Sequence, residues 1–547
     1  MKKVGIIIVI LFVLGLIGVG VLLLSPNYKK GPNEGKTNLV INYTNVTSTM
    51  KGSVFIEDGD VYISKESIEN YYDRYIYYDE QYNLIVIAKG DKTVCFDIAE
   101  GTMDINGTKT NAKVIEKDGY KYVPISKLED VYNIKVHPIS NSKIIVVESM
   151  DRQLEVSEIK KGTKLRLKRT SFSRGIEKLA VGDKVAIVPN QNNTKGYTYV
   201  RTQDGNLGYV KDDCLSSYTI EREAAKTEEN GKKVSLLWDY FESSAPRMDY
   251  AKKYDGVNVV SPSLFYMNSS TVKNRIDDNG VNYIRWAKNN NYEIWPMISN
   301  NNYSEDQMKE FSSWINDYKK RKSVIDQITK YVEEYKLDGI NIDFENMYLN
   351  DKNGFSRFVI ELKPALAKVG AKLSVDVTEP DGSENWSLCF NRNVIGDVAD
   401  YIVFMAYDQY GRGSNKAGPT AACYWVERNI NKFLNQEEVK PNKIILGIPL
   451  YSVLWKEKDG EVSGTAIPQK NISVPNGVET TWLEDSKQNY MEYTQGGYTC
   501  KMWIEDTEAT SQKLDFIKQY NLAGAAFWQK GFEDPNVWNL VEEKLAE

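Results

Sequence analysis

From residue 234 to the C-terminus, short apolar runs alternate with longer amphipathic stretches. This alternation indicates repeated strand–helix units and a parallel sheet. Eight apolar runs follow the pattern, at 234–238, 257–260, 294–298, 339–344, 373–377, 401–406, 444–448 and 523–528. Amphipathic helices are expected between them, for example over 324–335 and 355–369. Eight such units predict an α/β fold, a (β/α)8 TIM barrel over 234–547. The longest interval, after the seventh run, predicts an insertion that forms one wall of a cleft.

The chain before the barrel has two further patterns. Residues 62–65 followed by 84–87 are echoed by 124–127 followed by 144–147. Each copy predicts strand, short helix and strand, so 48–149 is expected to form an α+β stalk domain. Short alternating segments with glycine turns over 152–217 predict a small β-barrel.

The N-terminus predicts a membrane segment. Residues 4–24 are uncharged and almost wholly apolar, long enough for a helix that crosses a bilayer. We therefore expect a transmembrane anchor over 1–25, with a cleaved signal peptide as the alternative. The domains would then lie on the extracytoplasmic face of the cell membrane, or be secreted to the cell wall. The polar stretches 26–47 and 218–233 are expected to be linkers.

Composition narrows the function. Lys and Arg number 69 and Asp and Glu 75, and this mildly acidic balance argues against a nucleic-acid partner. His137 is the single histidine, which leaves no HExxH zinc site and no two-histidine iron site. The five cysteines have no CxxC spacing, so we expect no metal, no disulfide and no cofactor. Carboxylates and aromatic residues are abundant, as in carbohydrate enzymes.

The strongest chemical signal is the fourth run, which reads Asp-Gly-Ile-Asn-Ile-Asp-Phe-Glu over 338–345. Side chains alternate on a strand, so Asn341, Asp343 and Glu345 are expected to point into the barrel. Glu345 would lie last, at the C-terminal mouth where TIM barrels hold their active sites. The structural alternative is a hydrogen-bonded polar layer, but unpartnered buried carboxylates cost several kcal/mol.

These residues resemble the signature D-x-x-D-x-D-x-E of glycoside hydrolase family 18. Asp338, Asp343 and Glu345 match it, whereas Asn341 departs from it at the second Asp. The stretches 405–408, 447–451 and 524–528 also resemble family motifs, in the right order. Residues 383–387 and 405–409 look closest to the branch of bacterial cell-wall and spore-cortex N-acetylglucosaminidases, and the missing S-x-G-G stretch weakens chitin as the substrate.

The two N-terminal regions also carry resemblances. The stalk region is similar to a domain named after the N-terminal region of copper amine oxidases, although His137 alone argues against copper. The segment 197–210 resembles bacterial SH3-type domains of wall enzymes, which would serve as a peptidoglycan-binding module or as a spacer.

The family resemblance implies substrate-assisted retention, in which the 2-acetamido group of the sugar attacks the anomeric carbon. Glu345 would be the general acid and base, and Asp343 would orient the acetamide. Tyr407 would donate its hydroxyl to the same group, and Asp408 would assist, unless it forms a salt bridge. The remaining expected substrate contacts are Asn341, Met405, and Trp528 as the floor beneath the sugar or as core packing.

The sequence thus predicts a glycosidase that cleaves β-linked N-acetylglucosamine-containing glycans, with peptidoglycan first. A chitinase or chitooligosaccharide hydrolase is the alternative within the class. From another class, a non-catalytic wall-binding or sugar-binding surface protein is possible, although a lectin has no use for an acid at the mouth. The sequence does not indicate an oligomeric state.

Overall fold

The computed structural model describes residues 35–190, 196–225, 231–249 and 252–545. Apart from a hairpin tip at 90–93, the described residues up to position 225 form one compact unit and those from position 231 form a second. Each unit is described by itself below.

The second unit contains a closed ring of eight parallel strands. In chain order they are β21 (Val234–Asp239), β22 (Val259–Pro262), β25 (Glu293–Ile294) continued by β26 (Met297–Ser299), β27 (Gly339–Asp343), β28 (Lys372–Val377), β29 (Tyr401–Met405), β30 (Ile444–Pro449) and β36 (Gly524–Trp528). The ring closes because β21 pairs in parallel with both β22 and β36. The predicted TIM-barrel-like fold is therefore confirmed.

The third strand differs from its prediction. The run 294–298 is expected to be continuous, but the strand is interrupted between β25 and β26. Pro296 lies at the interruption, and proline has no backbone N–H to donate to a neighbouring strand.

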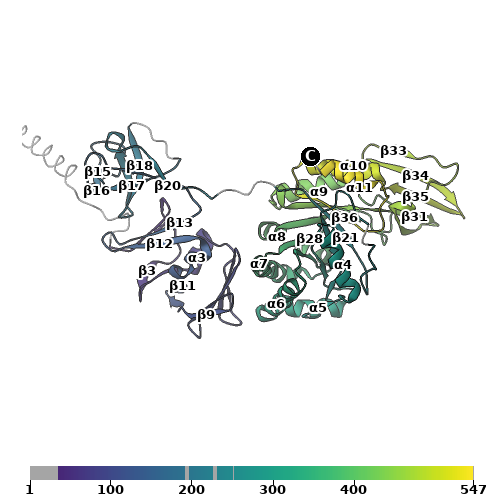
Figure 1. Cartoon of the computed structure of the whole chain (residues 1–547), viewed down its shortest axis with the longest axis horizontal. Helices are drawn as coiled ribbons and strands as arrows, with labels where there is room; N and C mark the ends of the chain where they lie inside the picture. Colours follow the sequence, from purple (N-terminus) through teal and green to yellow (C-terminus); the bar gives the residue numbers. More distant parts are fainter. Residues whose placement is uncertain (1–34, 191–195, 226–230, 250–251, 546–547) are drawn as a thin grey trace, which may run out of the picture. The chain divides into compact units, whose positions relative to one another are not determined.

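Helices surround the ring (Figure 1). They bury the outward side chains of the strands. They are α4 (Asp278–Asn289), α5 (Glu305–Ile315), α6 (Tyr318–Tyr335), α7 (Lys352–Lys368), α8 (Arg392–Val398), α9 (Cys423–Asn435), α10 (Thr507–Gln519) and α11 (Val537–Leu545). The predicted helices 324–335 and 355–369 correspond to α6 and α7. Phe344, one outward residue of the fourth run, packs against Trp314 of α5 and Phe358 of α7. The inward direction of the alternate residues follows from this packing.

The long interval after β30 forms a separate five-stranded antiparallel sheet (Figure 1). Its strands are β31 (Tyr451–Lys458), β32 (Glu461–Pro468), β33 (Thr481–Leu483), β34 (Gln488–Gln495) and β35 (Tyr498–Ile504). This sheet occupies the place of the predicted insertion. A smaller hairpin, β23 (Phe265–Asn268) with β24 (Thr271–Asn274), follows β22, and β23 pairs with β26.

In the first unit, the two copies of the near-repeat both fold as strand, helix and strand. The first copy contains β4 (Asp60–Ser64), α2 (Lys65–Tyr71) and β6 (Leu84–Lys89), and the second β11 (Tyr120–Pro124), α3 (Glu129–Tyr132) and β13 (Ile144–Ser149). Strands β4 and β11 pair antiparallel, so the two copies meet through equivalent elements. The other strands are β3 (Val54–Glu57), β5 (Tyr77–Asp79), β7 (Lys92–Asp97), β8 (Thr102–Ile105), β9 (Thr108–Asn111), β10 (Ile115–Lys117) and β12 (Ile134–Ile139).

The structure corrects the boundaries of both expected linkers. Within 26–47, β1 (Asn38–Ile41) pairs in parallel with β13 and β2 (Thr44–Asn45) pairs with β1. Leu39 and Val40 are buried, so two apolar side chains tie this segment to the sheet despite its polar composition. Within 218–233, β20 (Thr219–Arg222) pairs with β14 (Leu154–Glu158).

The 152–217 region forms one seven-stranded antiparallel sheet that includes β20. Its other strands are β14, β15 (Thr163–Arg166), β16 (Gly175–Leu179), β17 (Lys184–Ile187), β18 (Tyr197–Thr202) and β19 (Leu207–Lys211). Leu165, Val200 and Val210 are among the residues of its buried core. In the described part of the chain, no helix combines the length and the apolar character needed to span a membrane. The expected membrane segment 4–24 lies outside the described residues.

Candidate active site

A cavity of about 350 Å³ opens at the C-terminal ends of the barrel strands. Six predicted site residues line it, namely Asp343, Glu345, Met405, Tyr407, Asp408 and Trp528. Tyr451 and Ala466 of the insertion also line it, so the insertion forms part of its wall as predicted. Asn341 is the exception, because it lies fully buried in the barrel and does not reach the cavity.

Glu345 and Asp343 form a carboxyl pair at the mouth of β27. Burial and then the charge of Asp343 hold the pKa of Glu345 well above its ordinary value. Burial also raises the pKa of Asp343 to about 6, although a hydrogen bond from Glu345 opposes the rise. Near neutral pH the pair therefore holds one proton, on Glu345, and this is the protonation state that a general acid requires.

The backbone of Glu345 is fixed by Asn300, which follows β26. The side-chain oxygen of Asn300 accepts from the Glu345 N–H at 3.1 Å, and its amide donates to the Glu345 carbonyl at 2.6 Å. Asn300 is almost fully buried. The two bonds hold the acid where the strand ends and regular pairing no longer constrains the chain.

Asn341 organises the polar interior beneath the pair. Its oxygen accepts from the Trp238 indole N–H at 2.9 Å and from the Ser261 hydroxyl at 3.3 Å. Its amide donates to Ser374 at 3.0 Å and to a carboxylate oxygen of Asp376 at 2.7 Å. All four hydrogen-bonding positions of the amide are thus used. The residue that departs from the signature is therefore buried and links three neighbouring polar side chains and an indole by hydrogen bonds.

Asp376, on β28, adds a third carboxyl group that the sequence analysis missed. It lines the cavity and is almost fully buried. Burial, followed by the charge of Asp343, raises its pKa well above the ordinary value. Asp376 lies within the predicted apolar run 373–377, and a charged residue inside an apolar strand is the sequence signal that could have identified it.

Aromatic rings surround the carboxyl groups. Trp528 lies 5.8 Å from Trp238 and 6.5 Å from Tyr407 between ring centroids, and the Tyr407 ring is nearly parallel to it. Trp528 therefore both lines the cavity and packs in the core, so the two expectations for it are not exclusive. Burial holds the pKa of Tyr407 far above its ordinary value, so its hydroxyl remains a proton donor.

Tyr407 and Met405 are brought close to the cavity by Gly447 on β30. A Cβ at position 447 would lie 2.8 Å from the Phe404 carbonyl oxygen and 3.3 Å from the Tyr407 ring. Only glycine allows β30 to approach β29 this closely. This contact accounts for the glycine in the stretch 447–451.

Asp408 bonds to a tyrosine, not to a basic side chain. The Tyr451 hydroxyl donates a short hydrogen bond to it. Burial raises the pKa of Asp408, and the Tyr451 bond and the positive charge of Arg412 oppose that rise. The salt bridge that was the alternative for Asp408 is not formed among the described residues.

The loop after β28 brings Glu379 and Trp386 to the cavity. Arg392, fully buried at the start of α8, donates to the backbone carbonyls of Thr378, Glu379 and Ser387 at 3.1, 2.7 and 2.9 Å. This side chain ties both ends of the loop together.

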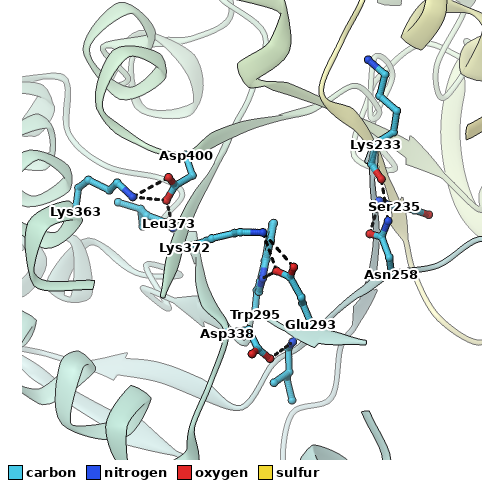
Figure 2. Close-up of polar contacts among 11 residues, drawn as sticks. Lys233, Ser235, Asn258, Glu293, Trp295, Asp338, Lys363, Lys372, Leu373 and Asp400 are labelled. Atoms are coloured by element: carbon cyan, nitrogen blue, oxygen red, sulfur yellow. Dashed lines mark hydrogen bonds and ion pairs between the residues drawn. The ribbon is translucent and has the colours of Figure 1, made fainter. Parts of the chain in front are cut away.

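Asp338, the first residue of the signature, lies at the opposite end of β27 and does not line the cavity. Its carboxylate accepts from the Ile294 N–H at 3.0 Å, next to Glu293, which pairs with Lys372 (Figure 2). Asp400 bonds the Leu373 N–H and Lys363 in a similar way (Figure 2). These contacts lie at the N-terminal ends of β25, β27 and β28, away from the cavity. Asp338 therefore stabilises the barrel and takes no part in the chemistry.

The arrangement supports acid–base chemistry on a sugar. It offers one protonated carboxyl, a charged neighbour, a tyrosine hydroxyl and an aromatic floor. Among the described residues, no three His, Cys, Asp or Glu side chains gather in a way that could hold a metal ion.

Comparisons with known proteins agree with this chemistry. The model of the family "Glycosyl hydrolases family 18" matches residues 236–533, more than half of the chain. The chain is 26% identical over 279 residues to the uncharacterized glycosylase YvbX of Bacillus subtilis (strain 168), covering 49% of this chain and 79% of that protein. It is 22% identical over 245 residues to the cortical fragment-lytic enzyme of the same organism, covering 42% of this chain and 55% of that protein.

Among solved structures, the chitinase from Chromobacterium violaceum ATCC 12472 aligns with a TM-score of 0.50 and 22% identity, over 58% of this chain and 99% of that chain. This likeness concerns the fold of the barrel. The family match covers all eight strands of the ring except the first residues of β21. The chain belongs to glycosyl hydrolases family 18.

Proposed function

We propose that the protein hydrolyses β-linked N-acetylglucosamine-containing glycans, with peptidoglycan as its substrate. The observation that carries this proposal is the carboxyl pair of Glu345 and Asp343, which lines the cavity at the mouth of the barrel and in which the pKa of Glu345 is raised. A cavity that only bound sugar would gain nothing from a buried acid whose pKa is raised.

In the proposed reaction, Glu345 donates its proton to the glycosidic oxygen as the bond to the leaving sugar breaks. The acetamide oxygen of the substrate attacks the anomeric carbon, and Asp343 accepts the acetamide N–H and offsets the positive charge that develops. Tyr407 donates its hydroxyl to the acetamide oxygen. Glu345, now charged, then takes a proton from water, which opens the cyclic intermediate with net retention.

Asn341, beneath the carboxyl pair, and Asp376, level with Asp343 on the neighbouring strand, support this site. Asn341 cannot titrate, so the proton that the family signature places on its second Asp has no holder at that position. Asp376 has a raised pKa and accepts from Asn341 at 2.7 Å, which suits it to hold a proton in the same network.

Peptidoglycan is favoured by the relatives. The cortical fragment-lytic enzyme is named for the lysis of cortical fragments, and this chain covers 55% of its length. Chitin or chitooligosaccharides are the second candidate, because the fold is shared with the Chromobacterium violaceum chitinase and other relatives have chitinase names. The alternative from another class is a non-catalytic, sugar-binding surface protein.

The N-terminal regions fit a cell-envelope protein. We propose that residues 4–24 anchor the chain in the cell membrane or export it to the wall, with the barrel on the extracytoplasmic face. We assign 48–149, extended by β1 and β2, to the stalk, and 152–217, extended by β20, to an SH3-like module.

The test is reducing-end analysis of a peptidoglycan digest. The full-length protein is incubated with purified peptidoglycan, and the new ends are reduced with borohydride and identified by mass spectrometry. New N-acetylglucosamine ends are expected. Release of soluble oligosaccharides from chitin alone would favour the second candidate, and sugar binding without new ends from either polymer would favour the non-catalytic alternative.

A further inference from the structure

The catalytic cavity continues into an open groove at the loop that follows β29. Asp408 and Arg412 line both the cavity and the groove, and Gly411, Gly413, Ser414 and Gly464 complete the groove. Space therefore extends beyond the carboxyl pair, as a substrate longer than one sugar requires.

The loop that carries Arg412 is held in place by contacts with the insertion and within the loop itself. A Cβ at Gly464 of β32 would lie 3.1 Å from the Arg412 carbonyl oxygen and 2.9 Å from the Trp455 ring, so the insertion packs directly on the loop. The Trp455 indole N–H donates to the Gly418 carbonyl at 2.8 Å, and the Gln409 N–H donates to the Thr420 carbonyl at 3.0 Å. These contacts fix the loop that carries Arg412.

The charge of Arg412 stands out from its surroundings. Among the described residues that line the cavity, Arg412 is the one cation, beside the carboxyl groups Asp343, Glu345, Asp376, Glu379 and Asp408. Its side chain is exposed, and it has no carboxylate within ion-pair distance among the described residues. Asp408, whose pKa the positive charge of Arg412 lowers, accepts a hydrogen bond from the Tyr451 hydroxyl. The guanidinium is thus available to an anion that enters the groove.

We infer that Arg412 forms an anion-binding subsite beside the catalytic cavity, which takes a carboxylate carried by the sugar next to the cleaved bond. The inference rests on the proposed function and refines its substrate. Chitin is uncharged and has no anionic group for a guanidinium to bind. In a peptidoglycan strand, every second sugar carries a lactyl group, which ends either in a free carboxylate or in an attached peptide stem. The planar fork of an arginine binds a carboxylate through two parallel hydrogen bonds.

Binding is measured first, on the full-length protein carrying Glu345→Gln so that the ligands are not consumed. The ligands are peptide-free peptidoglycan strands with free lactyl carboxylates, the same strands after amidation of those carboxylates, and a chitooligosaccharide of equal length. Adding Arg412→Gln should weaken binding of the carboxylate strand about 10- to 100-fold, as expected for a charge-assisted hydrogen bond. Binding of the amidated strand and the chitooligosaccharide should change less than about twofold.

Arg412→Lys should restore part of the affinity, because it keeps the charge and loses the fork. Lys416→Gln is the matched control, an exposed cation of the same loop that does not line the cavity. Equal losses for all three ligands would overturn the inference, because Arg412 would then act through Asp408 or the loop. Unchanged binding of the carboxylate strand would overturn it as well.

Hydrolysis by the chain with native Glu345 separates this inference from the proposed function. If no glycan is cleaved while the carboxylate-dependent loss persists, the subsite stands and the enzymatic proposal fails. If all glycans are cleaved and Arg412→Gln changes nothing, the enzymatic proposal stands and the subsite is refuted.

Discussion

Asn341 and Asp376 are joined by a 2.7 Å hydrogen bond between neighbouring strands, the amide donating and the carboxyl oxygen accepting. One residue is where the family signature has an aspartate, and the other is a carboxyl group outside the signature. The pair retains a titratable carboxyl beside Asp343, at the same level on the neighbouring strand, although the signature position itself cannot titrate.

Asp376→Asn should lower turnover about tenfold, less than loss of the acid itself, because the amide keeps an acceptor for Asn341 but cannot hold a proton. The KM should change little, and the pH profile should shift. Steady-state kinetics across pH measures both effects. Ser374→Ala is the control, since Ser374 also accepts a hydrogen bond from Asn341 but does not titrate. Equal effects of the two variants would show that Asp376 acts only as a hydrogen-bond acceptor.

Glu345→Gln should leave the fold and glycan binding intact and reduce turnover about 10² to 10⁴-fold, the usual contribution of a positioned acid. Initial rates on glycan and circular dichroism measure the two properties. Glu379→Gln, another carboxyl group lining the cavity, is the matched control and should retain more activity. Near-normal hydrolysis by a folded Glu345→Gln protein would refute the assignment.

Stability should fall as the pH rises through about 6. The folded pKa of Asp343 is raised to about 6, so its favourable contribution is complete below the unfolded pKa and is lost as the pH rises through the folded value. Asp343→Asn should remove the share of this loss that Asp343 contributes, about 1 to 2 kcal/mol in the free energy of unfolding at pH 7.5 relative to pH 5. Glu345 and Asp376, whose pKa values are also raised, keep part of the slope.

Urea denaturation at the two pH values measures this difference. Asp326→Asn, which alters an exposed ion pair on α6, should leave the slope with pH unchanged. A native-like slope in Asp343→Asn would show that Asp343 has an ordinary pKa.

Removing the N-acetyl group from the sugar at the cleavage site should stop hydrolysis, because the proposed nucleophile is then absent. A thiazoline analogue of the cyclic intermediate should bind far more tightly than substrate. Initial products should have the β configuration in an NMR time course. Early appearance of the α-anomer would indicate direct attack by water, with a carboxylate as base.

Chelators should not affect activity. The proposed steps use only Glu345, Asp343 and Tyr407, and the one histidine and five scattered cysteines offer no usual zinc ligand set. Activity is compared before and after EDTA treatment and dialysis. Loss with EDTA and recovery with zinc would contradict the carboxyl mechanism.

The apolar runs determined the barrel, because each strand of a parallel ring is buried on its outer face and must be apolar there. Alternation along 338–345 also determined that Ile340, Ile342 and Phe344 face the helices and that Asp343 and Glu345 face the cavity. The local pattern is sufficient for both, since the period of two is a property of the strand itself.

Tertiary structure decided which polar groups meet. Asn300, Asp376 and Arg412 follow or end different strands, and their distances to the carboxyl pair depend on how the ring closes, which spacing along one strand does not determine. Leu39 and Val40 show the same limit in the first unit. Their segment is polar in composition, yet it joins the sheet because β13, more than a hundred residues later, offers a parallel edge. Local patterns fix the direction of a side chain, and only packing between distant segments fixes its partner.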